Sequence, residues 1–223
     1  MRVATPLRSD SEIQASVEAE LQWTPEVDAA GIGVAVDDGV VALWGEVDNY
    51  ADRLAAKRAA LRVRGVGAVV DNLVVHPNSR LSVSPTDIGK EVEHALRSAV
   101  NIPDAVKAEV DGHSVVLTGQ VSWDYQRQAA QRAVQYLRGV NSVNNRITLT
   151  PRASAVGTEL RIKSAIIRNA QLDAKAIHVT VDGDTVTLSG KVRSWAEKRQ
   201  AEAAAWSSPH VNDVRNDILV RPL

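Results

Sequence analysis

The chain has 223 residues, of which 44% are hydrophobic and 24% charged, and this composition is typical of a soluble globular protein. It contains no cysteine, which excludes disulfides, thiolate nucleophiles and cysteine-ligated metal sites. The formal net charge of −1 argues against a nucleic-acid-binding protein, so we expect no nucleic-acid partner. The charge is unevenly spread: residues 1–80 hold 8 basic against 12 acidic side chains, and residues 152–223 hold 11 against 8.

The N-terminal stretch MRVATPLRSDSEIQ lacks the apolar core of a secretory signal. No part of the sequence approaches the ~18 consecutive apolar residues of a membrane-spanning helix. The sequence therefore predicts a cytoplasmic protein, with room for a peripheral position at a membrane. A periplasmic or envelope location is the alternative.

The first predicted element is a helix, because Ile13, Val17 and Leu21 recur every four residues. Alternating apolar residues then predict two strands, around 32–36 and 40–47. The turn between these strands reads Asp-Asp-Gly, and such residues tolerate the positive φ of tight hairpins. We therefore expect an antiparallel hairpin after the first helix.

A second helix is predicted after the hairpin, with Asn49 as its N-cap and Ala56 and Ala59 on its inner face. A third strand over 65–75 closes the pattern. The unit is thus helix–strand–strand–helix–strand over about 70 residues, a size that gives only a modest core.

The same order of elements recurs twice more along the chain. It can be anchored on Gly45, Gly119 and Gly190, which lie 74 and 71 residues apart. The sequence therefore predicts an α+β fold of three tandem αββαβ modules, each a small three-stranded mixed sheet packed against two helices. The predicted modules cover residues 1–78, 79–151 and 152–223, with linkers at 76–85 and 150–157.

The three anchoring glycines lie in the middle of an apolar strand face, where a side chain would be expected. The helix that follows each of them is lined with alanine. We interpret Gly45, Gly119 and Gly190 as structural glycines that allow a close approach of helix and sheet, or that mark a local bulge.

The glycine strand reads V-x-L-x-G-x-V at 41–47, 115–121 and 186–192. The closing strand follows the pattern G-V-x-x-V-x-N-x-[IL]-x-[VL], which is complete at 139–149. These motifs and the order of elements resemble the BON domain (bacterial OsmY and nodulation domain), in three copies that span nearly the whole chain. The first copy departs from the family pattern with Asp71 in place of asparagine.

The resemblance implies a phospholipid-binding or transport-associated module of envelope and stress proteins, without shared catalytic residues. The predicted function is therefore that of a non-enzymatic binding and assembly protein, with anionic phospholipid or the membrane surface as partner. The alternative is a homo-oligomeric scaffold or pore-like, transport-associated assembly.

Motifs for catalysis or metal binding are missing from the sequence. The five histidines occupy non-equivalent positions in the repeats, and the pattern HExxH does not occur. The pairs Gly31-Ile-Gly33 and Gly65-Val-Gly67 lack the third glycine of a dinucleotide-binding loop. We therefore expect no catalytic residue, no metal site and no cofactor.

The third copy combines an aromatic residue with a group of basic residues. Trp195 lies at the start of the second helix, and the nearby cations are Lys191, Arg193, Lys198 and Arg199. An aromatic ring beside cations suits the headgroup region of an anionic membrane, so these five residues form a candidate lipid-binding patch. The alternative is an aromatic ring that covers the core beside a solvated charged face.

Trp44 lies on the strand face opposite to Leu43. Because Leu43 is expected in the core, Trp44 is expected to point outward. We interpret Trp44 as a candidate interface residue that meets a neighbouring module or chain.

Overall fold

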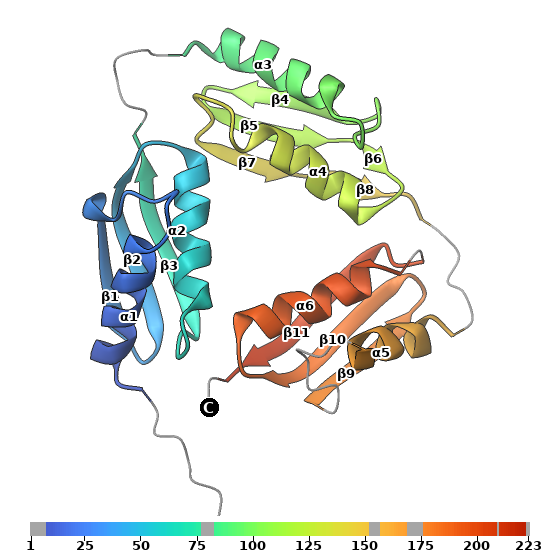
Figure 1. Ribbon diagram of the computed structural model, residues 1–223. Helices are drawn as coiled ribbons and strands as arrows, with labels where there is room; N and C mark the ends of the chain where they lie inside the picture. Colours follow the sequence, from blue (N-terminus) through green and yellow to red (C-terminus); the bar gives the residue numbers. More distant parts are fainter. Residues whose placement is uncertain (1–7, 77–82, 152–156, 169–175, 209, 222–223) are drawn as a thin grey trace, which may run out of the picture.

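The structure is a computed structural model that describes residues 8–76, 83–151, 157–168, 176–208 and 210–221. It contains three modules, each with the predicted helix–strand–strand–helix–strand order (Figure 1). The predicted α+β fold of tandem αββαβ modules is confirmed. Most of the two predicted linkers lies outside the described residues.

Module 1 begins with a helix that has a capped start. Its elements are α1 (Asp10–Gln22), the short 3-10 turn η1 (Ala29–Gly31), β1 (Ile32–Asp37), β2 (Val40–Val47), α2 (Tyr50–Arg62) and β3 (Ala68–Val75). Ser9 and Glu12 form a capping box at the start of α1, and these hydrogen bonds from Ser9 hold the pKa of Glu12 below its usual value. At the start of α2, burial raises the pKa of Asp52, with Asp48 adding to the effect.

Modules 2 and 3 repeat this plan. Module 2 contains α3 (Pro85–Ser98), β4 (Lys107–Asp111), β5 (Ser114–Thr118), β6 (Gln120–Val121), α4 (Asp124–Val134), β7 (Ser142–Asn145) and β8 (Thr148–Leu149). Module 3 contains α5 (Thr158–Arg168), β9 (Ile177–Asp182), β10 (Thr185–Val192), α6 (Trp195–Trp206) and β11 (Asp213–Val220). The central strand of module 2 is interrupted at Gly119, so its sheet is split into β4-β5-β7 and β6-β8.

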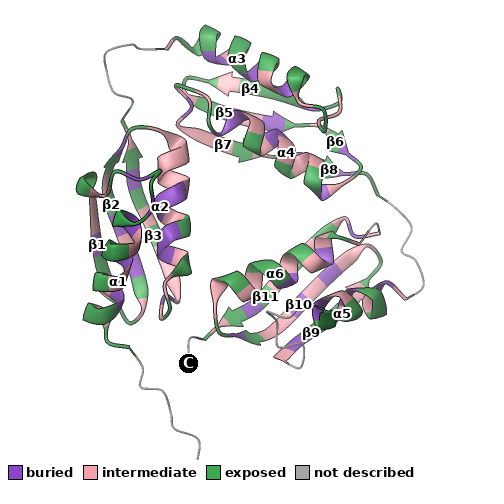
Figure 2. Ribbon diagram, viewed as in Figure 1, coloured by how far each residue is buried: buried purple, intermediate pink, exposed green. Residues whose placement is uncertain are grey.

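The central strand of each sheet is the one that carries the glycine. In module 1, β2 pairs antiparallel with β1 and parallel with β3, and module 3 repeats this with β9, β10 and β11. The helices cover one face of each sheet, and the buried residues lie between the two layers (Figure 2). In the described part of each module, the helices leave the opposite face of the sheet uncovered.

At the three strand glycines, a side chain would meet a neighbour other than the predicted helix. Gly45, Gly119 and Gly190 have φ values of +120°, +126° and +123°. A Cβ atom at Gly45 would lie 2.0 Å from the carbonyl oxygen of Gly31, and one at Gly190 would lie 2.0 Å from that of Ala176. The close approach is therefore to the backbone that enters the neighbouring edge strand, and the helix–sheet interpretation is corrected in this respect.

The three modules are arranged around a common centre, with α2, α4 and α6 on the inner side (Figure 1). Tyr50, at the start of α2, packs on the core of module 2. Trp206, at the end of α6, packs on the cores of both module 2 and module 3. Because the start of α6 also lies beside the end of α2, the inner helices meet end to end in a ring.

Candidate functional site

The junction of modules 3 and 1 encloses a hollow of about 230 Å³. One wall is the segment that ends α2 and turns into β3, from Arg62 to Val66. The other wall is the start of α6, with Arg193, Ser194, Trp195 and Glu197. Residues about 130 positions apart in the sequence are thus brought together by the ring.

The junction hollow is predominantly basic. Arg62 donates to Glu20 Oε1 at 2.7 Å and to Thr24 Oγ1 at 2.9 Å, so its charge is partly neutralised. Among the described residues, the guanidinium groups of Arg64 and Arg193 have no acidic partner within ion-pair distance, and both residues are exposed. The hollow therefore holds two cations that are available to an anion.

One acid, Glu197, also lines the hollow, and its carboxylate is held at the helix start. Glu197 Oε2 accepts a hydrogen bond of 2.9 Å from the backbone N–H of Arg193, while Ser194 caps the helix through the N–H of Glu197. The Glu197 carboxylate therefore compensates part of the basic charge, and the three arginines outnumber it.

Trp195 contributes a hydrogen-bond donor that is unused within the described structure. Its indole Nε1 is buried and has no hydrogen-bond partner there. Lys198 Nζ lies 5.4 Å from the centre of the Trp195 ring and donates at 2.8 Å to the carbonyl oxygen of Ile218. A buried N–H without an acceptor is costly, so a bound acceptor at this position would stabilise the site.

The structure divides the five residues of the predicted lipid-binding patch. Arg193 and Trp195 line the junction hollow. Lys198 is half-buried and engaged with Ile218, whereas Lys191 and Arg199 are exposed and do not line the hollow. The structure thus places Trp195 at a contact between modules rather than on an open surface.

Sequence reasoning missed Arg62 and Arg64, because they belong to module 1, which is acidic as a whole. The only signal for them is local: the stretch RVRG places two arginines at the predicted turn from helix to closing strand. Nothing in the sequence says that this turn faces Trp195. Only the packing of the modules brings the two basic segments together.

The other two junctions differ in character. Where α4 begins, Trp123 and Tyr125 line a hollow with Ala203 and Trp206, and the guanidinium of Arg127 lies 4.6 Å from the centre of the Trp206 ring. Residues that occupy the positions of Arg193 in modules 1 and 2 are Asp48 and Ser122. The position of Arg193 is therefore basic in module 3 alone.

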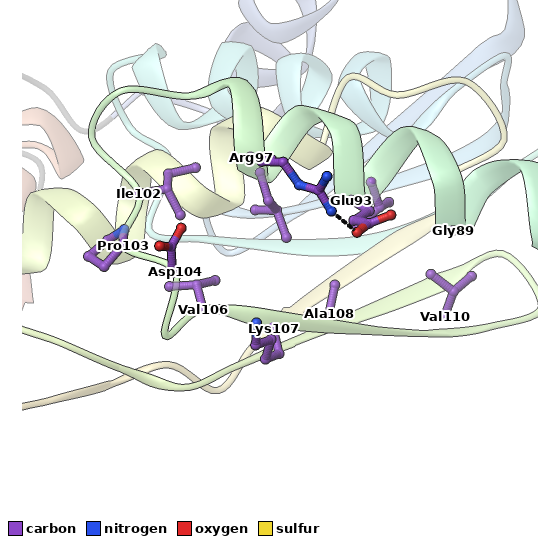
Figure 3. Close-up of a pocket in the computed structure, with 12 residues that line it drawn as sticks. Gly89, Glu93, Arg97, Ile102, Pro103, Asp104, Val106, Lys107, Ala108 and Val110 are labelled. Atoms are coloured by element: carbon purple, nitrogen blue, oxygen red, sulfur yellow. Dashed lines mark hydrogen bonds and ion pairs between the residues drawn. The ribbon is translucent and has the colours of Figure 1, made fainter.

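A separate hollow of about 410 Å³ lies in module 2, between α3 and the edge strand β4 (Figure 3). Its floor is apolar, with Val92, Leu96 and Val106, and Glu93 and Arg97 pair at its rim. A volume of this size is in the range of small-ligand sites.

One small residue contributes to the hollow in module 2. Ala108 is exposed, whereas Val34 and Val179, at the same position in modules 1 and 3, are buried. The missing methyl groups leave part of the space between helix and edge strand unfilled. The spacing of the repeats predicted the equivalence of these positions but not the hollow.

No group of three or more histidine, cysteine or acidic residues in the described part of the chain is placed to hold a metal ion. None of the helices in the described ranges is long and apolar enough to cross a membrane.

The sequence was compared with known families and proteins. The family model described as BON domain matches residues 9–77, 84–151 and 156–222. The osmotically-inducible protein Y of Escherichia coli (strain K12) is 32% identical over 141 residues, which cover 61% of this chain and 70% of that protein.

The solved structures matched by this chain show only low similarity. They include CdsD, a structural protein of the type III secretion system of Chlamydia trachomatis, at 13% identity and a TM-score of 0.28, with coverage of 95% of this chain and 93% of that one. The periplasmic domain of PrgH is matched at 13% identity and a TM-score of 0.22, with 85% and 95% coverage. Scores this low carry no argument about function.

Proposed function

The chain belongs to the BON domain family, and from this premise we propose that it is a non-enzymatic binding protein of the bacterial envelope that recognises anionic phospholipid. The observation that carries the proposal is the basic hollow between modules 3 and 1. There, Arg64 and Arg193 line the same hollow as Trp195, whose buried indole N–H has no hydrogen-bond partner within the described structure.

The chemistry of the hollow suits a phosphate group. Guanidinium groups bind phosphate oxygens through charge-assisted hydrogen bonds, and the Trp195 N–H adds a further donor. The start of α6 contributes the positive end of a helix dipole, although Glu197 offsets part of it. An anion with several acceptor oxygens would satisfy more of these groups than water alone.

The size of the hollow limits what it can hold. A volume of about 230 Å³ accommodates a phosphoryl headgroup but is too small for a whole lipid. We therefore place only the headgroup in the hollow, with the acyl chains remaining in the bilayer. Exposed Lys191 and Arg199 of module 3 would add long-range attraction to an anionic surface.

The proposal is tested by flotation of the full chain with vesicles. We expect binding to vesicles that contain phosphatidylglycerol, no binding to phosphatidylcholine alone, and weaker binding as salt is raised, because the attraction decays over a Debye length of ~8–10 Å. Binding that is equal for both vesicle types would contradict the proposal.

Competition with inorganic phosphate distinguishes a membrane headgroup from a free phosphorylated solute as the ligand of this site. If the site serves membrane headgroups, millimolar phosphate should compete only weakly, because the vesicle presents many headgroups at once. Full displacement of the vesicles by low phosphate would indicate a site for a free phosphorylated solute, and the membrane role would then be abandoned.

A further inference from the structure

The open sheet face of module 1 is apolar. The residues on this face are Gly33 and Ala35 on β1, Val40, Ala42 and Trp44 on β2, and Ala68, Val70, Asn72 and Val74 on β3; we call this set the module 1 face. Four of its large side chains are substantially exposed, with Val40 at 39%, Trp44 and Val70 at 45% and Val74 at 50%. Acidic residues lie only at its ends, at Asp37 and Glu46.

The fold itself does not require an apolar face here, because modules 2 and 3 have polar residues at the positions of Trp44 and Val70. The position of Trp44 is held by Thr118 and Ser189, one residue before the strand glycine in each case. The position of Val70 is held by Asn144 and Arg215, which pair in register with the same central-strand position. The three faces share a backbone and differ in chemistry, so the apolar character of the module 1 face needs a separate cause.

Trp44 lies flat across this face rather than projecting from it. A Cβ atom at Gly33, which pairs with Trp44 across the hairpin, would lie 2.3 Å from the Trp44 ring, so the ring occupies the space that a side chain there would fill. The face is consequently flat. A flat apolar sheet packs best on another flat apolar sheet, about 10 Å away.

We infer that the module 1 face packs on the same face of a second copy of this chain, in a weak two-fold dimer. Strands of six, eight and eight residues, at ~3.3 Å per residue and ~4.8 Å between strands, give about 350 Å² per copy and about 700 Å² for the pair. Stable interfaces bury more than about 1,000 Å², so the dimer should be weak and should form at about 0.1 mM and above.

The charge of module 1 disfavours an anionic membrane as the occupant of this face. Residues 1–80 hold 8 basic against 12 acidic side chains, so an anionic surface would repel this module. Two copies also repel each other, but salt screens that repulsion while the apolar contact remains. Added salt should therefore strengthen the dimer.

The test is sedimentation velocity of the full chain at concentrations from 0.01 to 1 mM, a range of about a hundredfold around the dissociation constant expected for the dimer. We expect a concentration-dependent shift from monomer to dimer that increases with salt. Trp44→Ser and Val70→Arg introduce the module 3 residues and should each weaken the dimer at least about 10-fold, since aromatic and central apolar contacts dominate small interfaces.

Leu219→Ser is the matched control. Leu219 is an exposed apolar residue on the open face of module 3, at 54%, and its removal should leave the dimer unchanged. Circular dichroism of each variant tests whether it is folded. If Trp44→Ser fails to fold, the dimerisation of Val70→Arg alone tests the inference. A wild-type chain that stays monomeric at 1 mM, or variants that dimerise as well as wild type, would overturn the inference.

The salt response keeps this inference separate from the proposed function, because salt weakens phospholipid binding and strengthens the dimer. Binding of wild type to neutral phosphatidylcholine vesicles that is lost in Trp44→Ser would show that the occupant is a membrane, and it would also overturn the dimer.

Discussion

Modules 1 and 3 have the same backbone plan and opposite surfaces. Both contain a central strand with antiparallel and parallel neighbours, and both use a glycine at the same point of that strand. Module 1 is acidic and has an apolar open sheet face around Trp44, whereas module 3 is basic and has Ser189 and Arg215 on the corresponding face. The comparison shows that the repeat preserves the core and the turns, while the surfaces are free to take different partners.

One half-buried position carries different side chains in the two modules. In module 3, Asn216 donates to the carbonyl oxygen of Lys198 and to Glu202, and it accepts from the N–H of Ile218. In module 1, Asp71 accepts both from the N–H of Leu73 and from Arg53. In module 3 the amide at this position thus donates hydrogen bonds to the second helix. In module 1 the carboxylate at this position accepts a hydrogen bond from the second helix.

The largest expected loss of stability concerns the strand glycine that the two modules share. Gly45→Ala and Gly190→Ala should each lower the free energy of unfolding by about 3 kcal/mol or more, because the new Cβ would meet a carbonyl oxygen at a positive φ. Denaturant unfolding of both variants measures this. Gly183→Ala is the control: it has a φ of +59° but open space around it, so it should cost only about 1 kcal/mol. Equal losses for all three would contradict the importance of the close approach.

The next largest effect tests the different roles of Asn216 in module 3 and of Asp71 at the equivalent position in module 1. Asn216→Asp removes two donated hydrogen bonds and places a carboxylate beside Glu202, so we expect a loss of about 2 kcal/mol in unfolding free energy. Asp71→Asn should cost less than about 1 kcal/mol, because its ion pair with Arg53 is partly exposed. Thermal or denaturant melts of the two variants compare them directly. A reversed order of the two losses would show that the modules do not differ in this way.

Much of the fold was predictable from sequence, because it depends on local patterns. The periodicity of Ile13, Val17 and Leu21 and the hairpin turn residues are short-range signals, and the repetition of the pattern three times made them stronger. The role of Gly45 was only partly predictable. The sequence indicates that a side chain is forbidden there, but the obstructing atom, the carbonyl oxygen of Gly31, becomes known only from the pairing geometry.

The candidate site was less predictable than the fold. Arg193 and Trp195 were identified because they are close together in the sequence. Arg64 was not identified, because its proximity to them depends on how whole modules pack in the ring. The hollow in module 2 was missed for a similar reason, since the effect of Ala108 depends on where α3 lies over β4.

A smaller change in stability is expected at Ala108 of module 2, where modules 1 and 3 have valine. Ala108→Val restores the residue found at this position in both other modules, so it should fill part of the hollow and raise the free energy of unfolding by about 1 kcal/mol. Val34→Ala, the reverse change in module 1, should lower it by about 2 kcal/mol, because Val34 is buried. Denaturant melts report both. Destabilisation by Ala108→Val would show that the hollow is kept open by its surroundings and cannot be filled.

The most direct test of the basic junction is the affinity of a double charge reversal for phosphatidylglycerol vesicles. Arg64→Glu with Arg193→Glu should weaken binding by at least about 30-fold, since the loss of each cation near an anionic surface costs about 1 kcal/mol and each new carboxylate adds repulsion. The control is Arg132→Glu with Arg138→Glu in module 2, which changes the net charge equally and places Arg138→Glu at the repeat position of Arg64. We expect the control to bind within about threefold of wild type, because long-range attraction alone is screened by salt. Equal losses in the two double variants would contradict a specific site at the junction of modules 3 and 1.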